Sequence, residues 1–198
     1  MKISSLKDCV NKHQGKRIFI FGTGPGVNDV SPEQIRHIEE NEISIGINYT
    51  PIALTPNYWI AGGHPTLAAF AIEHLEEKTI GFFHHDPGTI QKYPKTDKLI
   101  YIEDQNASDP IPEDKNVGRL VGGHNIILTA SHLAYVLGAK EIIYIGFSQV
   151  NRLHFYNLWD EERQQWFKQL LRDLRDKYKH DSSIVECVNE VLNVNEPD

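Results

Sequence analysis

The chain has 198 residues, of which 40% are hydrophobic and 24% are charged. This composition excludes a disordered or fibrous protein, and the length predicts a single nucleotide-binding domain over residues 1–198. The net charge of −7 argues against nucleic acid as a partner, because nucleic-acid binders need a positive surface to displace counterions. Any phosphate ligand must then be held by local donors, such as backbone N–H groups at a helix start.

Cysteine usage and hydropathy indicate a cytoplasmic protein. The two cysteines, Cys9 and Cys187, lie near opposite ends of the chain and form no metal-binding or redox motif. Residues 1–16 lack the apolar core of a signal peptide. No segment approaches the run of about 20 apolar residues that a membrane helix needs, so no transmembrane segment is expected.

Strands and helices alternate along the first half of the chain. Residues 17–21 (RIFIF) form an apolar run that ends in glycines, which is typical of a strand covered on both faces. Ser31, Pro32 and Gln34 predict a helix start with a capping box, and this helix is expected to end near residue 40. Further strands are expected at residues 43–47, 57–61 and 78–83, with a helix at 65–75.

The second half begins with a less regular segment. Residues 87–118 are rich in Pro, Asp, Lys and Asn, with a strand expected only at 99–102, so the segment is interpreted as an insertion or lid. A helix at residues 126–137 with Gly138 as its C-cap, and a strand at 141–145, are expected next. A helix at 160–178 and a last strand at 183–188 complete the chain. The buried stripe of that helix is expected to consist of Trp166, Phe167, Leu170, Leu171 and Leu174.

This alternation predicts an α/β, Rossmann-like fold, with a mainly parallel sheet, helices on both faces and an irregular insertion. Ligands of such sheets bind beyond the carboxyl ends of the strands. The loops expected at that edge are residues 22–26, 48, 62–64 and 146–156.

A glycine loop follows the first predicted strand and consists of Gly22, Thr23, Gly24, Pro25 and Gly26. Glycine lets a phosphate or sugar approach the backbone closely, so we expect this loop to contact a nucleotide. The loop is not a dinucleotide motif, because Val27 replaces the third glycine and the second strand ends in Asn48 in place of an acid. The chain has no G-K-[ST] triplet, which excludes a P-loop.

Two further polar positions allow two interpretations each. Asn48 suits a base, ribose or phosphate oxygen, and it is equally typical of a turn. The loop at residues 122–125 (GGHN) precedes a predicted helix whose N–H groups suit an anion, although Asn125 is equally typical of an N-cap. Beyond the glycine loop, nucleotide contacts are expected from Asn48, Gly123, His124, Asn125 and Ser148.

Ten histidines are many for this length, and several fall in predicted loops, namely His64, His84, His85, His124 and His154. No metal site is expected, because the chain offers no compact set of ligands. Most of these histidines are interpreted as surface or turn residues. His154 is the exception, because it follows the end of a buried strand, where a general base would face the ligand. Gly63, His64 and Tyr156 are expected to bind the substrate.

Three segments resemble the bacterial sialyltransferase and DUF115 (MptE-like, motility accessory factor) superfamily. They are residues 17–28 (RIFIFGTGPGVN), 43–49 (ISIGINY) and 125–148 (NIILTASHLAYVLGAKEIIYIGFS). The resemblance implies a nucleotide loop at Gly22, Gly24 and Pro25, a nucleotide contact from Asn48, a pocket flanked by the GGHN loop, and a histidine base at His154. It also suggests a homo-oligomer.

The sequence departs from the pattern of this superfamily at three positions. Gly26 stands where the family has serine, Ser148 where it has aspartate, and Asn57 where the pyrophosphokinase branch has aspartate. The last two changes remove carboxylates that would bind Mg²⁺. We therefore expect a sialyltransferase-like glycosyltransferase that uses a nucleotide sugar, such as a CMP-activated sugar, and requires no cofactor.

Two alternatives to this function remain open. One is a Mg²⁺-dependent pyrophosphokinase of the MptE type, with Asp86 and Asp104 as the nearest candidate metal ligands. The other is a nucleotide-binding module that has the fold but no catalytic activity, because fold does not imply function.

Overall fold

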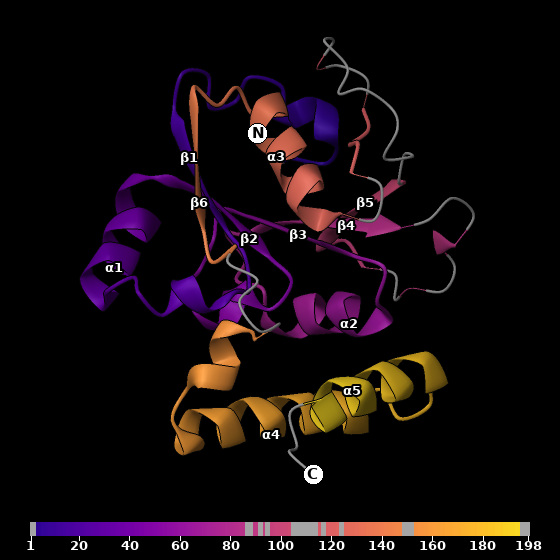
Figure 1. Cartoon of the computed structure of the whole chain (residues 1–198). Coiled ribbons are helices and arrows are strands. Elements are labelled where there is room, and N and C mark those ends of the chain that lie inside the picture. Colours follow the sequence, from indigo (N-terminus) through magenta and orange to yellow (C-terminus); the bar gives the residue numbers. More distant parts are fainter. Residues whose placement is uncertain are drawn as a thin grey trace.

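The computed structural model describes residues 3–85, 89–90, 93, 96–103, 115, 118–122, 125–147 and 153–194. Within these ranges, parallel strands form one open six-stranded sheet with helices on both faces, as Figure 1 shows. The predicted α/β, Rossmann-like architecture is therefore confirmed. None of the helices in the described ranges is both long and apolar enough to cross a membrane.

The strands are β1 (Arg17–Phe21), β2 (Ile43–Ile47), β3 (Tyr58–Gly62), β4 (Ile80–His85), β5 (Leu99–Glu103) and β6 (Glu141–Ile145). Their order across the sheet is β5-β4-β3-β2-β1-β6. The predicted bounds of β1, β2 and β6 are confirmed, because each is an apolar run with a clear polar or glycine boundary.

The prediction that His84 and His85 lie in a loop was wrong. Both are buried strand residues, since β4 pairs with β3 and β5 as far as these positions.

The helices are α1 (Pro32–Asn41), α2 (Pro65–His74), α3 (Ile126–Val136), α4 (Glu161–Lys177) and α5 (Ser182–Val194), with short 3₁₀ turns η1 (Leu6–Cys9), η2 (Pro25–Val27), η3 (Thr50–Ile52) and η7 (Phe155–Leu158). The capping box predicted for α1 is present, since the backbone N–H of Gln34 donates to Ser31 and the backbone N–H of Ser31 donates to Gln34. The helix predicted before β6 also ends as expected, with Gly138 in the left-handed conformation (φ +90°) just after it.

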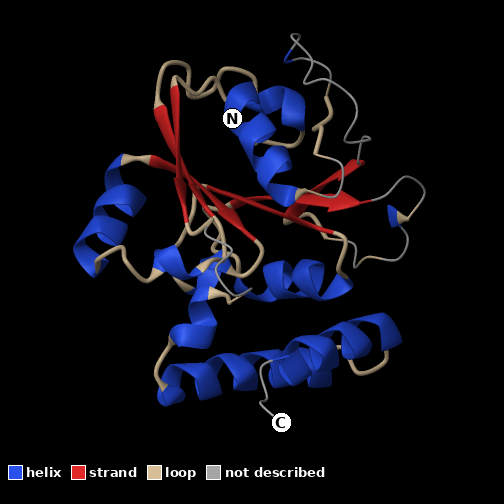
Figure 2. Ribbon diagram, in the orientation of Figure 1, coloured by secondary structure: helices blue, strands red, loops and turns tan. Residues whose placement is uncertain are grey.

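The order of the strands explains why helices cover both faces. From β1 to β5 each strand pairs with the next one along the chain, and α2 packs on one face against Trp59 and Ala61. The chain then returns to the free side of β1, and α3, which precedes β6, packs with Ile18 and Ile20 on the opposite face. Right-handed crossovers that run in opposite directions place their helices on opposite faces. Figure 2 shows this two-sided covering.

The two C-terminal helices form a further layer outside α2 (Figure 1). The prediction of a strand at residues 183–188 was wrong, because this segment belongs to α5. Ile184, Val188 and Leu192 are buried and recur at intervals of four, which is the period of a helix. The carboxylate of Asp181 accepts hydrogen bonds from the backbone N–H groups at the start of α5.

The apolar stripe of α4 is partly as predicted. Phe167, Leu171 and Leu174 are buried and Leu170 is partly buried, whereas the side chain of Trp166 is 50% exposed. The prediction that Trp166 belongs to the buried stripe was therefore wrong. Trp166 instead lies within 6.3 Å of the Trp159 ring, measured between ring centroids.

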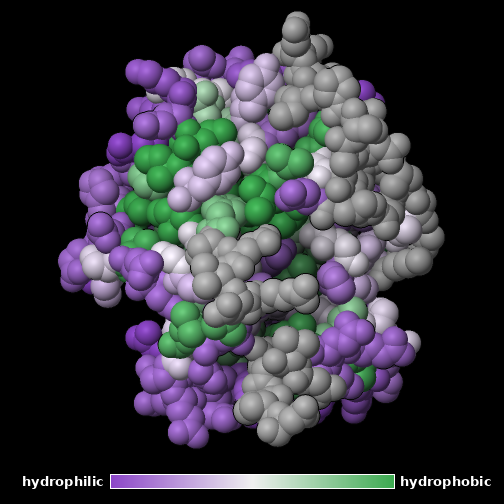
Figure 3. Space-filling view, in the orientation of Figure 1, coloured by the Kyte–Doolittle hydropathy of each residue, from purple (hydrophilic) through white to green (hydrophobic). Residues whose placement is uncertain are grey.

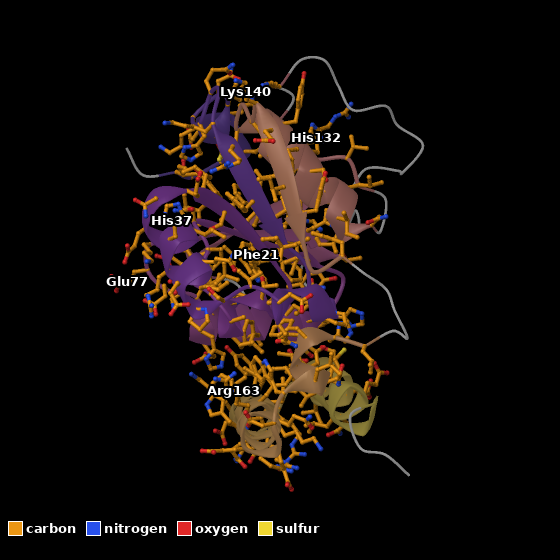
Figure 4. The ribbon with its side chains drawn as sticks, turned by 60° about the vertical axis from the view of Figure 1, so that its left-hand side comes forward. Phe21, His37, Glu77, His132, Lys140 and Arg163 are labelled. Carbon is orange, nitrogen blue, oxygen red and sulfur yellow. The ribbon has the colours of Figure 1, made fainter. Side chains whose placement is uncertain are left out.

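The end of β1 is fixed by the core beside α1. Phe21, labelled in Figure 4, is fully buried and packs with Ile38 and Leu54. Because Phe21 is the last residue of the strand, its burial anchors the point from which the glycine loop departs.

The edge of the sheet at β6 is less covered. Figure 3 shows apolar surface over β6 and α3, and the side chain of Leu128 on α3 is 47% exposed.

Candidate functional site

The loops that follow β1 and β6 meet at the point where the strand order reverses. From β1 the chain adds strands on one side as far as β5, and it then returns to add β6 on the other side of β1. β1 lies between β2, the next strand in the chain, and β6, the last. In open parallel sheets the connections at such a point diverge to opposite faces and leave a crevice for a ligand. A cavity of about 350 Å³ lies here, which we call the switch-point cavity.

Segments that are distant in the sequence form the switch-point cavity. They are the glycine loop, the carboxyl end of β2, the first turn of α3, the loop after β6 and the residues before η7. Five of the predicted site residues border it, namely Gly22, Thr23, Gly24, Asn48 and His154. Among the described residues, no lysine, arginine, aspartate or glutamate lines it.

Backbone hydrogen bonds join the glycine loop to the loop after β6. The N–H of Gly22 donates to the carbonyl of Ile145 at 2.8 Å, and the N–H of Gly24 donates to the carbonyl of Gly146 at 2.7 Å. A Cβ on Gly22 would lie 2.6 Å from the Gly146 carbonyl oxygen. These two N–H groups are thus already paired within the protein, and the lack of a side chain at Gly22 permits the close contact of the two loops.

The other members of the glycine loop lie outside the switch-point cavity. Pro25 and Gly26 begin η2 and do not border the cavity. A Cβ on Gly26 would have its nearest neighbour at 3.6 Å, an ordinary van der Waals contact. Close packing therefore does not explain the glycine at this position.

The first turn of α3 provides the remaining backbone donors. The side chain of Asn125 accepts a hydrogen bond from the N–H of Ile127 at 3.0 Å, so Asn125 is the N-cap of the helix. Ile126 and Ile127 border the switch-point cavity. A helix N-terminus carries a partial positive charge that stabilises an anion nearby. The predicted contacts Gly123, His124 and Ser148 lie outside the described residues, as do the candidate Mg²⁺ ligands Asp86 and Asp104.

Asn48 acts as a turn residue and also borders the cavity. Its φ is +52°, in the left-handed region that asparagine adopts more readily than most residues. Its N–H donates to the carbonyl of Ile60 and its carbonyl accepts from the indole N–H of Trp59. The side-chain amide makes no hydrogen bond within the described part of the chain, so both interpretations of Asn48 remain compatible with the geometry.

His154 is held against the glycine loop. Its Nδ1 is hydrogen-bonded to the hydroxyl of Thr23 at 3.0 Å. The next residue, Phe155, donates its N–H to the carbonyl of Thr23 at 2.8 Å and accepts from the side-chain amide of Asn28 at 2.9 Å. The imidazole stacks on Tyr156, with the ring centroids 5.0 Å apart and the planes at 20°. These contacts fix a titratable side chain at the edge of the switch-point cavity.

The surroundings of His154 favour its neutral form. Burial lowers the pKa of His154, and a hydrogen bond to the backbone of Thr23 opposes this shift. The imidazole still reaches solvent, so protons can exchange with it. An imidazole that is neutral at pH 7 can accept a proton from a substrate.

The predicted substrate-binding residues border two neighbouring cavities. Gly63 and His64 line a cavity of about 320 Å³ beside the end of β4, together with His84 and His85. His64 and Tyr156 line a second cavity of about 190 Å³ beside α5. The described residues contain no cluster of three His, Cys, Asp or Glu side chains arranged to hold a metal ion.

Several residues of the cavity beside α5 escaped the sequence analysis. Cys187 and Glu190 lie on α5, of which residues 183–188 were predicted to be a strand, and Tyr49 was named only as the end of the segment 43–49. The helical spacing of Ile184, Val188 and Leu192 would have placed Cys187 and Glu190 together on one side of a helix.

The fold and the crevice define the class of the protein, an open parallel α/β sheet with a cavity at the topological switch point. A comparison with protein-family models found no match, and a comparison with curated proteins found no similar sequence. The resemblance to the sialyltransferase and DUF115 superfamily is thus carried by the three sequence segments alone.

Proposed function

We propose that the protein is a nucleotide-sugar-dependent glycosyltransferase, with the nucleotide in the switch-point cavity and His154 as the general base. The observation that carries the proposal is the attachment of His154 to Thr23 in the glycine loop, at the edge of that cavity. A base held at this position can act on an acceptor hydroxyl while the loop contacts the donor.

The lining of the switch-point cavity favours a donor with little charge. Its described residues carry no charged carboxylate, ammonium or guanidinium group, and polar contacts are available from the amide of Asn48 and the first turn of α3. A single phosphate can be stabilised by one helix N-terminus, whereas a triphosphate needs a cation or several basic side chains. A nucleoside monophosphate sugar such as a CMP-sugar is the donor that best fits, and it requires no cofactor.

The proposed reaction uses the two ring nitrogens of His154 for different tasks. In the tautomer that serves this reaction, the Nδ1–H donates to the hydroxyl of Thr23, which leaves Nε2 to take the proton of the acceptor hydroxyl. The acceptor oxygen bonds to the anomeric carbon of the sugar as the bond between that carbon and the phosphate oxygen breaks. The electron pair of the broken bond leaves with the nucleoside monophosphate. A positioned base of this kind contributes about 10²–10⁴ in rate.

Ligand-dependent unfolding tests the nucleotide site. Thermal unfolding is followed with CMP, CDP, UDP, GDP and ATP, each with and without Mg²⁺, at about 100 times the dissociation constant, where a specific ligand adds about 2.7 kcal/mol. Stabilisation by CMP without metal is expected. Stabilisation by ATP only with Mg²⁺ would favour the pyrophosphokinase alternative, and no stabilisation by any nucleotide would contradict the nucleotide site.

The variant His154→Gln tests the base. Transfer from a CMP-sugar is expected to fall by about 10²–10⁴, while stabilisation by CMP persists, because the base acts on the acceptor and not on the nucleotide. His37→Gln on the exposed face of α1 (Figure 4) is the matched control, with transfer unchanged. Full transfer activity in His154→Gln would exclude the proposed role. Stabilisation without any transfer in the unaltered protein would indicate a binding module.

A further inference from the structure

A second cavity adjoins the switch-point cavity across His154. It has a volume of about 190 Å³, and we call it the α5 cavity. Thr23, Asn48 and His154 border both cavities, and the far wall of the α5 cavity comes from the start of α2 and from α5. A group that moved from a ligand in one cavity to a ligand in the other would therefore pass His154.

Two buried tyrosines supply the α5 cavity with hydroxyl groups. Tyr49 and Tyr156 border it and are only 7% and 6% exposed. Neither hydroxyl makes a hydrogen bond within the described part of the chain, and neither is among the polar atoms sealed from solvent. Burial raises the pKa of both hydroxyls, so they stay protonated and can donate. Polar groups that are nearly buried and still unpaired favour a ligand that can pair with them.

A thiol and an imidazole complete the polar wall. The Sγ of Cys187 lies 3.7 Å from Nδ1 of His64. Burial raises the pKa of the Cys187 thiol, which therefore remains protonated at pH 7. A protonated thiol that donates to Nδ1 leaves the Nε2–H of His64 as a further donor.

The charges around the α5 cavity are negative. Glu190 borders it, and Glu190, Glu186 and Asp181 each act to raise the pKa of Cys187. No lysine or arginine among the described residues borders this cavity. An anionic ligand would be repelled, whereas a neutral ligand or an amine would not.

We propose that the α5 cavity binds the acceptor, a neutral or amino-bearing polyhydroxy compound of the size of one sugar residue, with its reacting hydroxyl beside His154. This inference rests on the proposed function, because the cavity receives the second substrate of that reaction. The hydroxyls of Tyr49 and Tyr156 bind the acceptor, and Glu190 excludes acidic sugars.

Alkylation of Cys187 by iodoacetamide tests this occupancy directly. Cys9 is fully buried and burial raises its pKa to about 12, whereas Cys187 is only partly buried. Cys187 is therefore the more reactive of the two thiols, and alkylation is carried out at alkaline pH so that part of it is ionised. The probes are methyl glucoside, glucosamine and glucuronate, each titrated against the alkylation rate. Methyl glucoside and glucosamine are each expected to slow alkylation by about 11-fold at ten times the dissociation constant, whereas glucuronate is expected to leave the alkylation rate unchanged.

Tyr156→Phe and Tyr49→Phe are expected to weaken this protection. Tyr144→Phe, an exposed position on β6, is the matched control and leaves protection unchanged. Absence of protection by both methyl glucoside and glucosamine would overturn the inference, and protection by glucuronate as strong as theirs would overturn the assigned charge preference. Stabilisation by CMP is measured on the same samples. Protection by the sugars without stabilisation by CMP would contradict the proposed function but leave the sugar site in place. Stabilisation by CMP without protection by the sugars would contradict the α5 site alone.

Discussion

The two cavities on either side of His154 differ in how their polar groups are paired. Around the switch-point cavity, the N–H groups of Gly22 and Gly24 are already hydrogen-bonded to the loop after β6. Around the α5 cavity, the hydroxyls of Tyr49 and Tyr156 have no hydrogen bond within the described residues. The glycine backbone therefore gives the first cavity a fixed shape, whereas the second cavity adds unpaired tyrosine hydroxyls.

The largest expected effect concerns the joined loops of the switch-point cavity. Gly146 has φ +73°, and a Cβ there would lie 2.5 Å from Val27. Gly146→Ala is expected to lower the free energy of unfolding by about 2–4 kcal/mol, through backbone strain and overpacking. Gly26→Ala is the matched control and is expected to change it by less than about 0.5 kcal/mol. Denaturant unfolding measures the free energy of unfolding of both variants. Equal losses of stability would show that the contact between the two loops does not require a glycine at position 146.

An intermediate effect is expected at Asn48, which borders both cavities. Asn48→Ala places a Cβ residue in the left-handed region without the local hydrogen bonding of asparagine, and should cost about 1 kcal/mol of stability. Asn48→Gly relieves that strain and should keep stability, yet weaken CMP binding by up to about tenfold through loss of the amide. Unfolding with and without CMP separates the two roles. Unchanged CMP binding in Asn48→Gly would leave Asn48 as a turn residue only.

The smallest expected effect is the dependence of stability on pH. Burial lowers the pKa of His13, His74, His132 and His154. The unfolded chain therefore binds more protons than the folded chain, so stability is complete above the unfolded histidine pKa of about 6.5 and is lost as the pH falls through it. The free energy of unfolding should be lower at pH 5.5 than at pH 7.5.

Two variants show where this pH dependence originates. His132 is fully buried on α3, and its Nδ1 accepts from the N–H of Val121. His132→Leu and His154→Gln should each reduce the difference in unfolding free energy between the two pH values, whatever their effect on stability itself. A pH difference of opposite sign would contradict the lowered pKa of these histidines.

The sequence predicted the sheet well, because its strands carry strong local signals. β1, β2 and β6 are short apolar runs with abrupt polar or glycine ends. β1 and β2 lie inside the sheet, where cover on both faces requires such runs, whereas β6 is a partly exposed edge strand. The segment that became α5 was predicted as a strand over residues 183–188, although the four-residue spacing of Ile184, Val188 and Leu192 favours a helix. The packing of this helix against α2 and α4 is a contact between distant segments, which no local pattern reveals.

The candidate site was predictable only in part. The position of the glycine loop and of His154 followed from the rule that ligands bind at the carboxyl ends of parallel strands. The pairing of the glycine N–H groups with the loop after β6 did not follow, because it depends on strand order. The α5 cavity was missed because it requires Cys187 and Glu190 on a helix that packs near α2.

The position of β6 also affects when the site forms during folding. β1 to β5 each pair with a neighbour along the chain, whereas β6 must join residues 17–21 to residues 141–145. Pairings between distant segments form slowly, because the long connecting chain must first be closed. The switch-point cavity is complete only when β6 docks on β1, so a ligand there recognises the finished sheet. Such a ligand would act mainly by slowing unfolding, and the early steps of folding would proceed without it.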